Sequence, residues 1–181
     1  MHLSPTMQKL VIHWGKMGAR WGINRSVAQI YALLFFSPEP LPADEIAETL
    51  SLARSNVSTS LRELQGWGIV TVTQRLGDRR EHYEALEDVW ETFQRIAAER
   101  RRREFDPTLD MLRASMRELD EAGAGADVAY AKQRLSHMLE FLQAVTSWHE
   151  ETRRLSPSAL RKLARFGTRI RKLLELPGGK P

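Results

Sequence analysis

The segment from Ser51 to Arg80 constrains the fold more than any other part of the chain. Within it, Val57, Leu61 and Leu64 recur at intervals of three and four residues, which is typical of the buried face of an α-helix. Gly66 then marks the end of this helix. The segment therefore predicts a short amphipathic helix that is packed on one side and free to contact a partner on the other.

The outer face of this predicted helix has an unusual composition, because its side chains are short and polar and its charges are mostly positive. Hydroxyl, amide and guanidinium groups bond DNA phosphates and base edges, and short side chains let a helix approach a major groove closely. An ordinary solvated surface helix is the alternative interpretation. The candidate DNA-contacting residues on this helix are Arg54, Ser55, Asn56, Ser58, Thr59 and Arg62.

A β-hairpin is predicted directly after the helix. Ile69–Arg75 is rich in β-branched residues and too short for a helix, Leu76–Arg80 reads as a turn, and His82–Leu86 reads as the returning strand. A helix followed by a hairpin with a basic tip is typical of a winged helix-turn-helix. In such domains the helix enters the major groove, and arginine on the wing suits the negative potential of the minor groove. The candidate DNA-contacting residues of the wing are Asp78, Arg79 and Arg80. Arg80 is expected to enter the minor groove, and Asp78, two residues earlier, is expected to pair with it and fix its direction.

At this point the sequence resembles the MarR-like transcriptional regulators, whose wing carries a characteristic D-x-R element that Asp78, Arg79 and Arg80 match. The sequence Trp21–Ser26 running into Ile30–Leu34, together with Gly77–Ala85, is similar to the GbsR-type branch. The resemblance covers roughly residues 10–93. It implies a dimeric DNA-binding regulator and, in some relatives, a small-molecule effector.

Before this segment, Met7–Trp21 predicts a helix with an apolar seam formed by Leu10, Trp14, Met17 and Trp21. The tryptophans of this seam are interpreted as core or dimer packing. The alternative, taken from the resemblance, is that they help to line an effector pocket. The candidate effector-binding residues are Trp14, Trp21 and Trp90.

The helix-turn-helix itself is predicted from three further elements. Asn24 is a plausible N-cap for a helix over Arg25–Phe36, Leu41-Pro42 is expected to form a short strand beside the wing, and Ala43–Leu50 is expected to form the helix before the turn. Asp44 lies in the first turn of that helix, where the helix dipole favours an acidic side chain.

Past the wing, Asp88 with Glu91 predicts the start of a long helix that runs into four consecutive arginines, Arg100–Arg103. Because these arginines point all round a helix, a solvated linker is favoured over a contact with DNA phosphates. Asp106-Pro107 predicts the start of a further helix, since proline suits the first helical position.

Three apolar stripes follow in the remaining helices, and the small winged helix core cannot cover all of them. They predict a dimer interface of antiparallel or coiled-coil-like helices, with a monomeric helical bundle as the alternative. The stripes are Leu109, Leu112, Met116 and Leu119; then Val128, Ala131, Leu135, Met138, Leu142 and Val145; and last Leu160, Leu163, Ile170 and Leu174.

Composition excludes several classes of function. The chain has no cysteine, so disulfides, thiolate metal sites and thiol-based oxidant sensing are excluded. It has no membrane-length apolar run, no leader-like N-terminus and no Walker, nucleophile-elbow or zincin motif. His137 and His149 are too far apart to hold a metal alone. We therefore expect a cytoplasmic protein that is not an enzyme and that binds no cofactor or metal.

The predicted fold class is mainly α with a small β-wing: a winged helix-turn-helix domain plus a helical dimerisation region. The expected divisions are 1–24 for an N-terminal helix, 25–87 for the DNA-binding domain, 88–176 for dimerisation and 177–181 for a flexible tail. The predicted function is a homodimeric regulator, expected to be a repressor, that recognises an inverted repeat in double-stranded DNA and has a possible effector.

Two other functions compete with this prediction. One is an oligomeric module that binds nucleic acid or the nucleoid without sequence preference. A membrane-surface helix over residues 160–174 is disfavoured, because it would leave the dimer stripe short.

Overall fold

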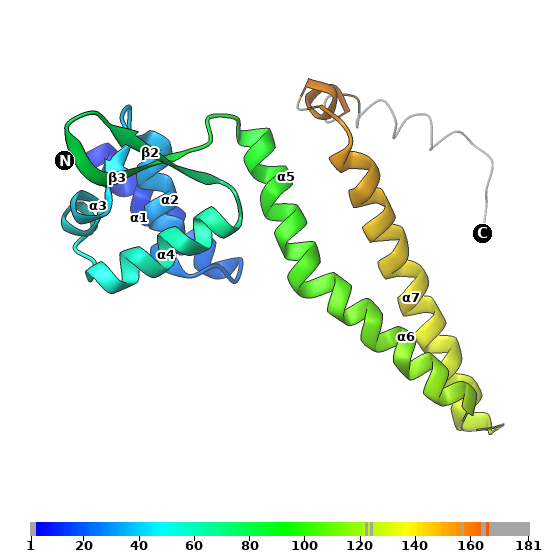
Figure 1. The fold of residues 1–181 in the computed structure, drawn as a ribbon. Helices are drawn as coiled ribbons and strands as arrows, with labels where there is room; N and C mark the ends of the chain where they lie inside the picture. The colour runs from blue at the N-terminus through cyan, green and yellow to red at the C-terminus, as the bar shows by residue number, and fades with distance from the viewer. Residues whose placement is uncertain (1–2, 122, 124, 157, 164–165, 167–181) are drawn as a thin grey trace. The chain divides into compact units, whose positions relative to one another are not determined.

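In a computed structural model the chain forms two compact units, Met1–Ile96 and Ala97–Pro181. The structure describes residues 3–121, 123, 125–156, 158–163 and 166. The described part is mostly helical and carries one three-stranded antiparallel sheet in the first unit (Figure 1). The predicted fold class, mainly α with a small β-wing, is confirmed, whereas dimerisation through the helical region stays a prediction.

The first unit begins with two packed helices, α1 (Pro5–Arg20) and α2 (Arg25–Phe36). The predicted N-cap of α2 is confirmed, because Asn24 Oδ1 accepts a hydrogen bond of 2.8 Å from the Ser26 backbone N–H. Helix α2 is buried along most of its length and forms the centre of the core, with Ile30 and Leu33 fully enclosed.

Helix α1 turns a different face to the core from the one that the sequence suggested. Its buried positions are Val11, Gly15 and Gly18, whereas Trp14 remains 37% exposed and Trp21 61% exposed. A Cβ at Gly18 would lie 2.5 Å from the Ala28 Cβ, so the helices approach through glycine. The interpretation that the tryptophans of this seam pack into the core of the first unit is therefore wrong. Close approach of backbones favours the glycine face over the bulkier one.

The helix-turn-helix consists of α3 (Ala43–Leu50) and α4 (Arg54–Gly66). Ser51 joins them in the left-handed region at φ 52°, which lets the chain turn sharply. The predicted apolar stripe of α4 is confirmed, since Val57, Leu61 and Leu64 are at most 2% exposed. They pack in one cluster with α2, which fixes the opposite face of α4 outward.

The wing is built from β2 (Val70–Arg75) and β3 (Asp78–Ala85), and β1 (Leu41–Pro42) pairs with the other edge of β3. The short extra strand predicted at Leu41-Pro42 is therefore confirmed. The turn is tighter than predicted: only Leu76 and Gly77 separate the strands, and Gly77 adopts φ 85°. Asp78, Arg79 and Arg80 consequently belong to strand β3 rather than to the tip.

Helix α5 (Val89–Arg100) follows the wing, and its predicted start is confirmed. Asp88 Oδ1 accepts hydrogen bonds from the backbone N–H groups of Trp90 and Glu91 at 2.7 and 3.2 Å. The beginning of α5 is fastened to α2 by a buried hydrogen bond of 3.3 Å from the Tyr31 hydroxyl to Thr92 Oγ1.

In the second unit a π-helix spans Arg101–Phe105 and α6 spans Asp106–Glu121. The prediction that a helical segment starts at Asp106 is confirmed, but Asp106 is not a non-helical N-cap, because the π-helix precedes it directly and Asp106 itself has helical dihedral angles. Pro107 has no N–H to donate to the carbonyl four residues earlier, and a wider π turn accommodates that loss.

The arginine run is held by carboxylates of the same unit. Arg101 forms ion pairs with Asp106 and with Glu150, which belongs to α7 (Ala126–Arg153). Arg102 and Arg103 both bind Glu99, at 2.6 and 2.5 Å. These side chains therefore take part in specific ion pairs, while those of Arg102 and Arg103 remain exposed to solvent.

Helix α7 (Ala126–Arg153) packs against α6 as a helical hairpin. Within the predicted α7 stripe most positions are half-buried, including Leu135 and Val145, while Leu109 and Leu112 of α6 are buried. Leu160 is also buried, whereas the predicted stripe members Ile170 and Leu174 and the tail 177–181 lie outside the described residues. In the described part of the chain, no helix is long and apolar enough to cross a bilayer.

Candidate nucleic-acid interface

The outward face of α4 presents most of the residues nominated for DNA contact. The buried stripe anchors one side of the helix, so the short polar and cationic side chains of the other side reach solvent. The exposed members are Arg54, Ser55, Ser58, Thr59 and Arg62. Arg62 lies along the helix surface, with its guanidinium 3.4 Å from both the Ser58 carbonyl and Thr59 Oγ1.

Asn56 is placed differently from the other nominated residues of α4. It is half-buried, and its side-chain amide donates to Ser26 Oγ of α2 at 2.9 Å. Its side-chain carbonyl accepts from the buried Ser60 hydroxyl at 3.3 Å. Asn56 thus connects α4 to α2, and its polar atoms point toward the protein.

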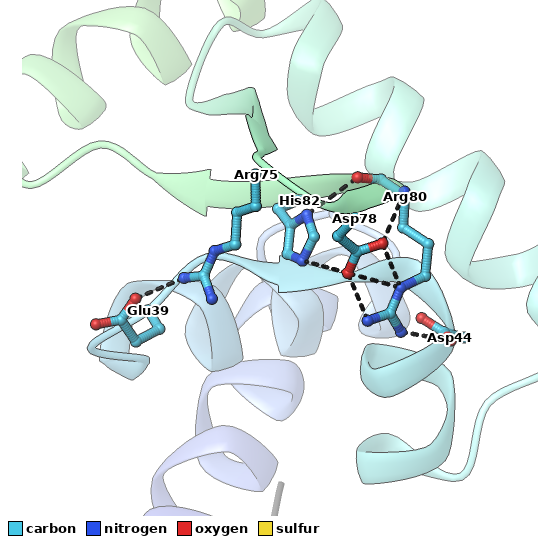
Figure 2. A network of polar contacts seen from close by, with 6 residues as sticks. All are labelled: Glu39, Asp44, Arg75, Asp78, Arg80 and His82. Atoms are coloured by element: carbon cyan, nitrogen blue, oxygen red, sulfur yellow. Dashed lines mark hydrogen bonds and ion pairs between the residues drawn. The ribbon is translucent and has the colours of Figure 1, made fainter.

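On the wing, Asp78 and Arg80 form a two-pronged ion pair (Figure 2). Arg80 Nε lies 3.1 Å from both carboxylate oxygens of Asp78, and Arg80 Nη2 lies 2.7 Å from Asp78 Oδ2. The Arg80 backbone N–H also donates to Asp78 Oδ1 at 3.0 Å. The sequence-based expectation that Asp78 directs Arg80 agrees with this geometry.

Arg80 has a second carboxylate partner that the sequence did not suggest. Its Nη1 lies 3.0 Å from Oδ2 of Asp44, in the first turn of α3 (Figure 2). Hydrogen bonding to Arg80 lowers the pKa of both carboxyl groups, and the two carboxylates raise the pKa of Arg80. The buried His82 supports the cluster, since its Nδ1 lies 3.0 Å from the Arg80 carbonyl oxygen.

A second ion pair ties the turn end of the wing to the loop after α2. Arg75 Nη2 of β2 lies 2.5 Å from Oε2 of Glu39 (Figure 2). Arg75 and Arg80 both line a hollow of about 390 Å³, and Ser37 and His82 are also among its lining residues. Two of the three wing arginines are therefore bound to carboxylates of other elements: Arg75 to Glu39 in the loop after α2, and Arg80 to Asp44 in the first turn of α3.

Arg79 is the third wing arginine. It is exposed, and its side chain forms no hydrogen bond or ion pair with any residue that the structure describes. The strand pairing is irregular at this position. Gln74 pairs with Glu81 and Arg75 pairs with Asp78, so Arg79 and Arg80 fall in a bulge that has no partner residues on β2.

Helix α4, here called the reading helix because it carries the nominated DNA-contacting residues, lines a second hollow of about 410 Å³ together with the wing. Its lining includes Arg54 and Ser58 from α4, Arg80 from β3 and Asp44 from α3. The structure therefore brings together residues that sequence reasoning placed on separate motifs. Asp44 and Glu39 were missed as members of this surface, because nothing local in the sequence connects them with a strand 36 residues later.

The three tryptophans nominated for an effector site lie away from these two hollows. Trp14 is on α1, Trp21 is the C-cap of α1, and Trp90 is near the start of α5. None of them lines the hollows beside the wing. No cluster of three or more potential metal ligands occurs among the residues that the structure describes.

Comparison with known proteins gives a consistent result. Residues 21–81 match the model of the MarR family. The chain is 22% identical over 139 residues to the HTH-type transcriptional repressor GbsR of Bacillus subtilis (strain 168), covering 76% of this chain and 77% of that protein. A crystal structure described as a transcriptional regulator shares the fold with a TM-score of 0.64, 19% identity, and coverage of 82% of this chain and 96% of that chain. The MarR-like, GbsR-type resemblance is confirmed, and the matched proteins are regulators of transcription, not enzymes.

Proposed function

Because residues 21–81 form a winged helix-turn-helix that matches the MarR family, we propose that this DNA-binding regulator recognises a specific inverted-repeat operator as a homodimer and represses transcription. The observation that carries this proposal is the exposed polar face of α4, which ends beside the wing. Side chains of this kind, at the tip of a rigidly held helix, are suited to base edges in a major groove.

Electrostatics support the division between helix and wing. Arg54 and Arg62 add positive charge to a helix face whose other members are hydroxyls, so that face combines phosphate attraction with hydrogen-bonding groups. The wing offers a further exposed arginine, Arg79, and arginine suits the negative potential of a minor groove. A protein that binds nucleic acid without sequence preference needs the positive charges of residues such as Arg54 and Arg62. It does not need the exposed hydroxyl groups that lie between them on this face.

Incomplete burial in the second unit supports a homodimer. The buried side chains among its described residues are few: Leu109, Leu112, Thr146 and Leu160. Helix α7 also has a second apolar stripe that α6 does not cover, because Phe141 is 66% and Trp148 67% exposed. Tyr130 lies on the same helical face. A second copy of the chain would cover this stripe, and a two-fold dimer would place two reading helices on an inverted repeat.

A small-molecule effector is the least direct part of the proposal. The exposed Trp14 and Trp21 share one face of α1, and aromatic faces attract cations such as quaternary amines, a ligand class that the resemblance suggests. Such a ligand would act by favouring one of two spacings of the reading helices. Titration of cationic, aromatic and phenolic compounds, followed by tryptophan fluorescence in the parent and in Trp14→Phe, tests this part.

The central experiment is selection of duplexes from a random pool by the purified protein, followed by footprinting on the best sequence. We expect enrichment of an inverted repeat and protection of two half-sites about one helical turn apart, roughly 34–36 Å. Binding that is equal for selected and scrambled duplexes at fixed salt would instead establish a sequence-independent nucleic-acid binder.

A further inference from the structure

We propose that Arg80 clamps the wing onto helix α3 without contacting DNA, and that Arg79 is the wing residue that enters the minor groove. The inference rests on the proposed DNA-binding function and assigns different roles to two adjacent arginines. It also corrects our expectation from the sequence, in which Arg80 was the residue inserted into the groove.

The hydrogen bonds of Arg80 are the first argument. All three guanidinium nitrogens already face carboxylates: Nε and Nη2 face Asp78, and Nη1 faces Asp44. An isolated surface ion pair contributes little, but a two-pronged arginine–carboxylate pair with a second carboxylate has the geometry in which such pairs hold direction. Entry into a groove would require Arg80 to leave both partners.

Local charge is the second argument. Arg80 lies between two carboxylates, so the Arg80 cluster carries one negative charge in excess if all three groups are ionised. Bringing that cluster against phosphates would add repulsion. Arg79 has no carboxylate partner among the described residues and keeps its full positive charge. The minor groove favours an unpaired guanidinium because its negative potential is strong where the groove is narrow.

Connectivity is the third argument. Asp44 belongs to α3 and Asp78 to β3, so Arg80 joins the wing directly to the first helix of the helix-turn-helix. Arg75 and Glu39 make a second connection at the turn end of the wing, to the loop after α2. Together these ion pairs set the angle between the wing and the reading helix, which decides whether both can reach adjacent grooves. Arg80, Asp44 and Asp78 are thus positioning residues.

The salt dependence of binding separates the two roles. The probes are a duplex that the protein selects from a random pool and a scrambled duplex of equal length, with affinity measured from about 50 to about 200 mM salt. Arg79→Gln removes one cationic contact from each wing of the proposed homodimer, so it should reduce the salt slope by about 1.8, and its loss of affinity across that range should be about 12-fold smaller than the parent's. It should weaken both duplexes by the same factor. Arg80→Gln should weaken binding and leave the slope unchanged.

Lysine substitutions provide the matched control, because lysine keeps the charge but cannot bridge two carboxylates as a fork. Arg79→Lys should retain the parent slope, whereas Arg80→Lys should behave like Arg80→Gln. Without DNA, hydrogen exchange of the residue 80 backbone N–H, which bonds Asp78, should speed up in Arg80→Gln and in Asp44→Asn but not in Arg79→Gln.

Several results would overturn the assignment. A slope that falls with Arg80→Gln, or that stays unchanged with Arg79→Gln, would show that the roles are reversed or shared. Parent-like affinity in Arg80→Lys together with unchanged hydrogen exchange in Asp44→Asn would remove the clamp. Failure of the parent protein to bind either duplex is a different outcome, which would reject the proposed function itself.

Discussion

Asn56 of the reading helix donates its side-chain amide to the Ser26 hydroxyl of α2 over 2.9 Å. The same side chain accepts a hydrogen bond from Ser60, which is 2% exposed. The reading helix is thereby fixed to the helix behind it by polar contacts as well as by its apolar stripe. Orientation of the exposed face depends on this attachment.

Asn56→Ala should destabilise the protein by about 1–3 kcal/mol, because it leaves the buried Ser60 hydroxyl without this acceptor. Ser55→Ala, on the exposed side of the same helix, should change stability by no more than about 0.5 kcal/mol. Urea denaturation of both variants measures the difference. If Asn56→Ala keeps full stability but changes which duplex is preferred, Asn56 contacts bases after all.

Thr59→Ala should act on sequence choice. Loss of one specific base contact is expected to weaken the selected duplex by about 1–3 kcal/mol while affinity for a scrambled duplex stays nearly constant. Gln65→Ala, an exposed change near the end of α4, should alter neither affinity. Competition binding at fixed salt measures the ratio. Equal losses on both duplexes would mean that this face holds phosphates only.

Gly18→Ala should separate α1 from α2. The added Cβ would lie 2.5 Å from the Ala28 Cβ, so a cost of about 1–3 kcal/mol is expected for overpacking. Gly66→Ala is the matched control, since a Cβ there meets nothing within 4 Å and should stabilise by about 0.4–1 kcal/mol. Thermal unfolding compares the two. A harmless alanine at position 18 would contradict close packing of these helices.

Phe141→Glu should convert the proposed homodimer to monomers, because it places a charge in the exposed stripe of α7 that a second copy would cover. Gln143→Glu adds the same charge to an exposed position off that stripe and should leave the assembly intact. Light scattering across protein concentration measures both. A parent protein that is already monomeric at micromolar concentration would refute the two-fold operator model.

Leu135→Glu, in the stripe first expected to form the dimer, has a less specific result. Leu135 is half-buried in a helix that packs on α6 of the same chain. The glutamate should therefore lower helix content and stability along with any dimerisation. Circular dichroism distinguishes it from Phe141→Glu, which should remain fully helical.

Asp78 should remain ionised at a pH where ordinary aspartates are protonated. Hydrogen bonding to Arg80 lowers its pKa in the folded state. Its stabilising contribution is therefore fully present above the ordinary aspartate value of about 3.9 and is lost only as pH falls through the lower folded value. Carboxyl carbon NMR titration should show this, and Arg80→Gln should raise the pKa of Asp78. An ordinary pKa for Asp78 in the parent would contradict the ion pair.

Much of the site could be predicted from the sequence because it depends on local spacing. The stripe of Val57, Leu61 and Leu64 determines which side of α4 is buried, and the opposite residues must then be exposed. Asp78 and Arg80 are two residues apart, so their pairing also follows from local geometry. The helix caps at Asn24 and Asp88 are local hydrogen bonds as well.

The tertiary structure alone decided the features that join distant segments. From the sequence, Asp44 is an acid that suits the helix dipole, whereas the fold places its carboxylate 3.0 Å from Arg80. From the sequence, Asn56 is a candidate DNA contact, whereas in the fold its amide donates to Ser26 of α2. Glycine, which weakens an isolated α1, forms its packing face because it allows the closest contact with α2. Periodicity determines that a helix has two faces. Which polar groups on them remain free for DNA depends on the neighbours that folding brings within hydrogen-bonding distance.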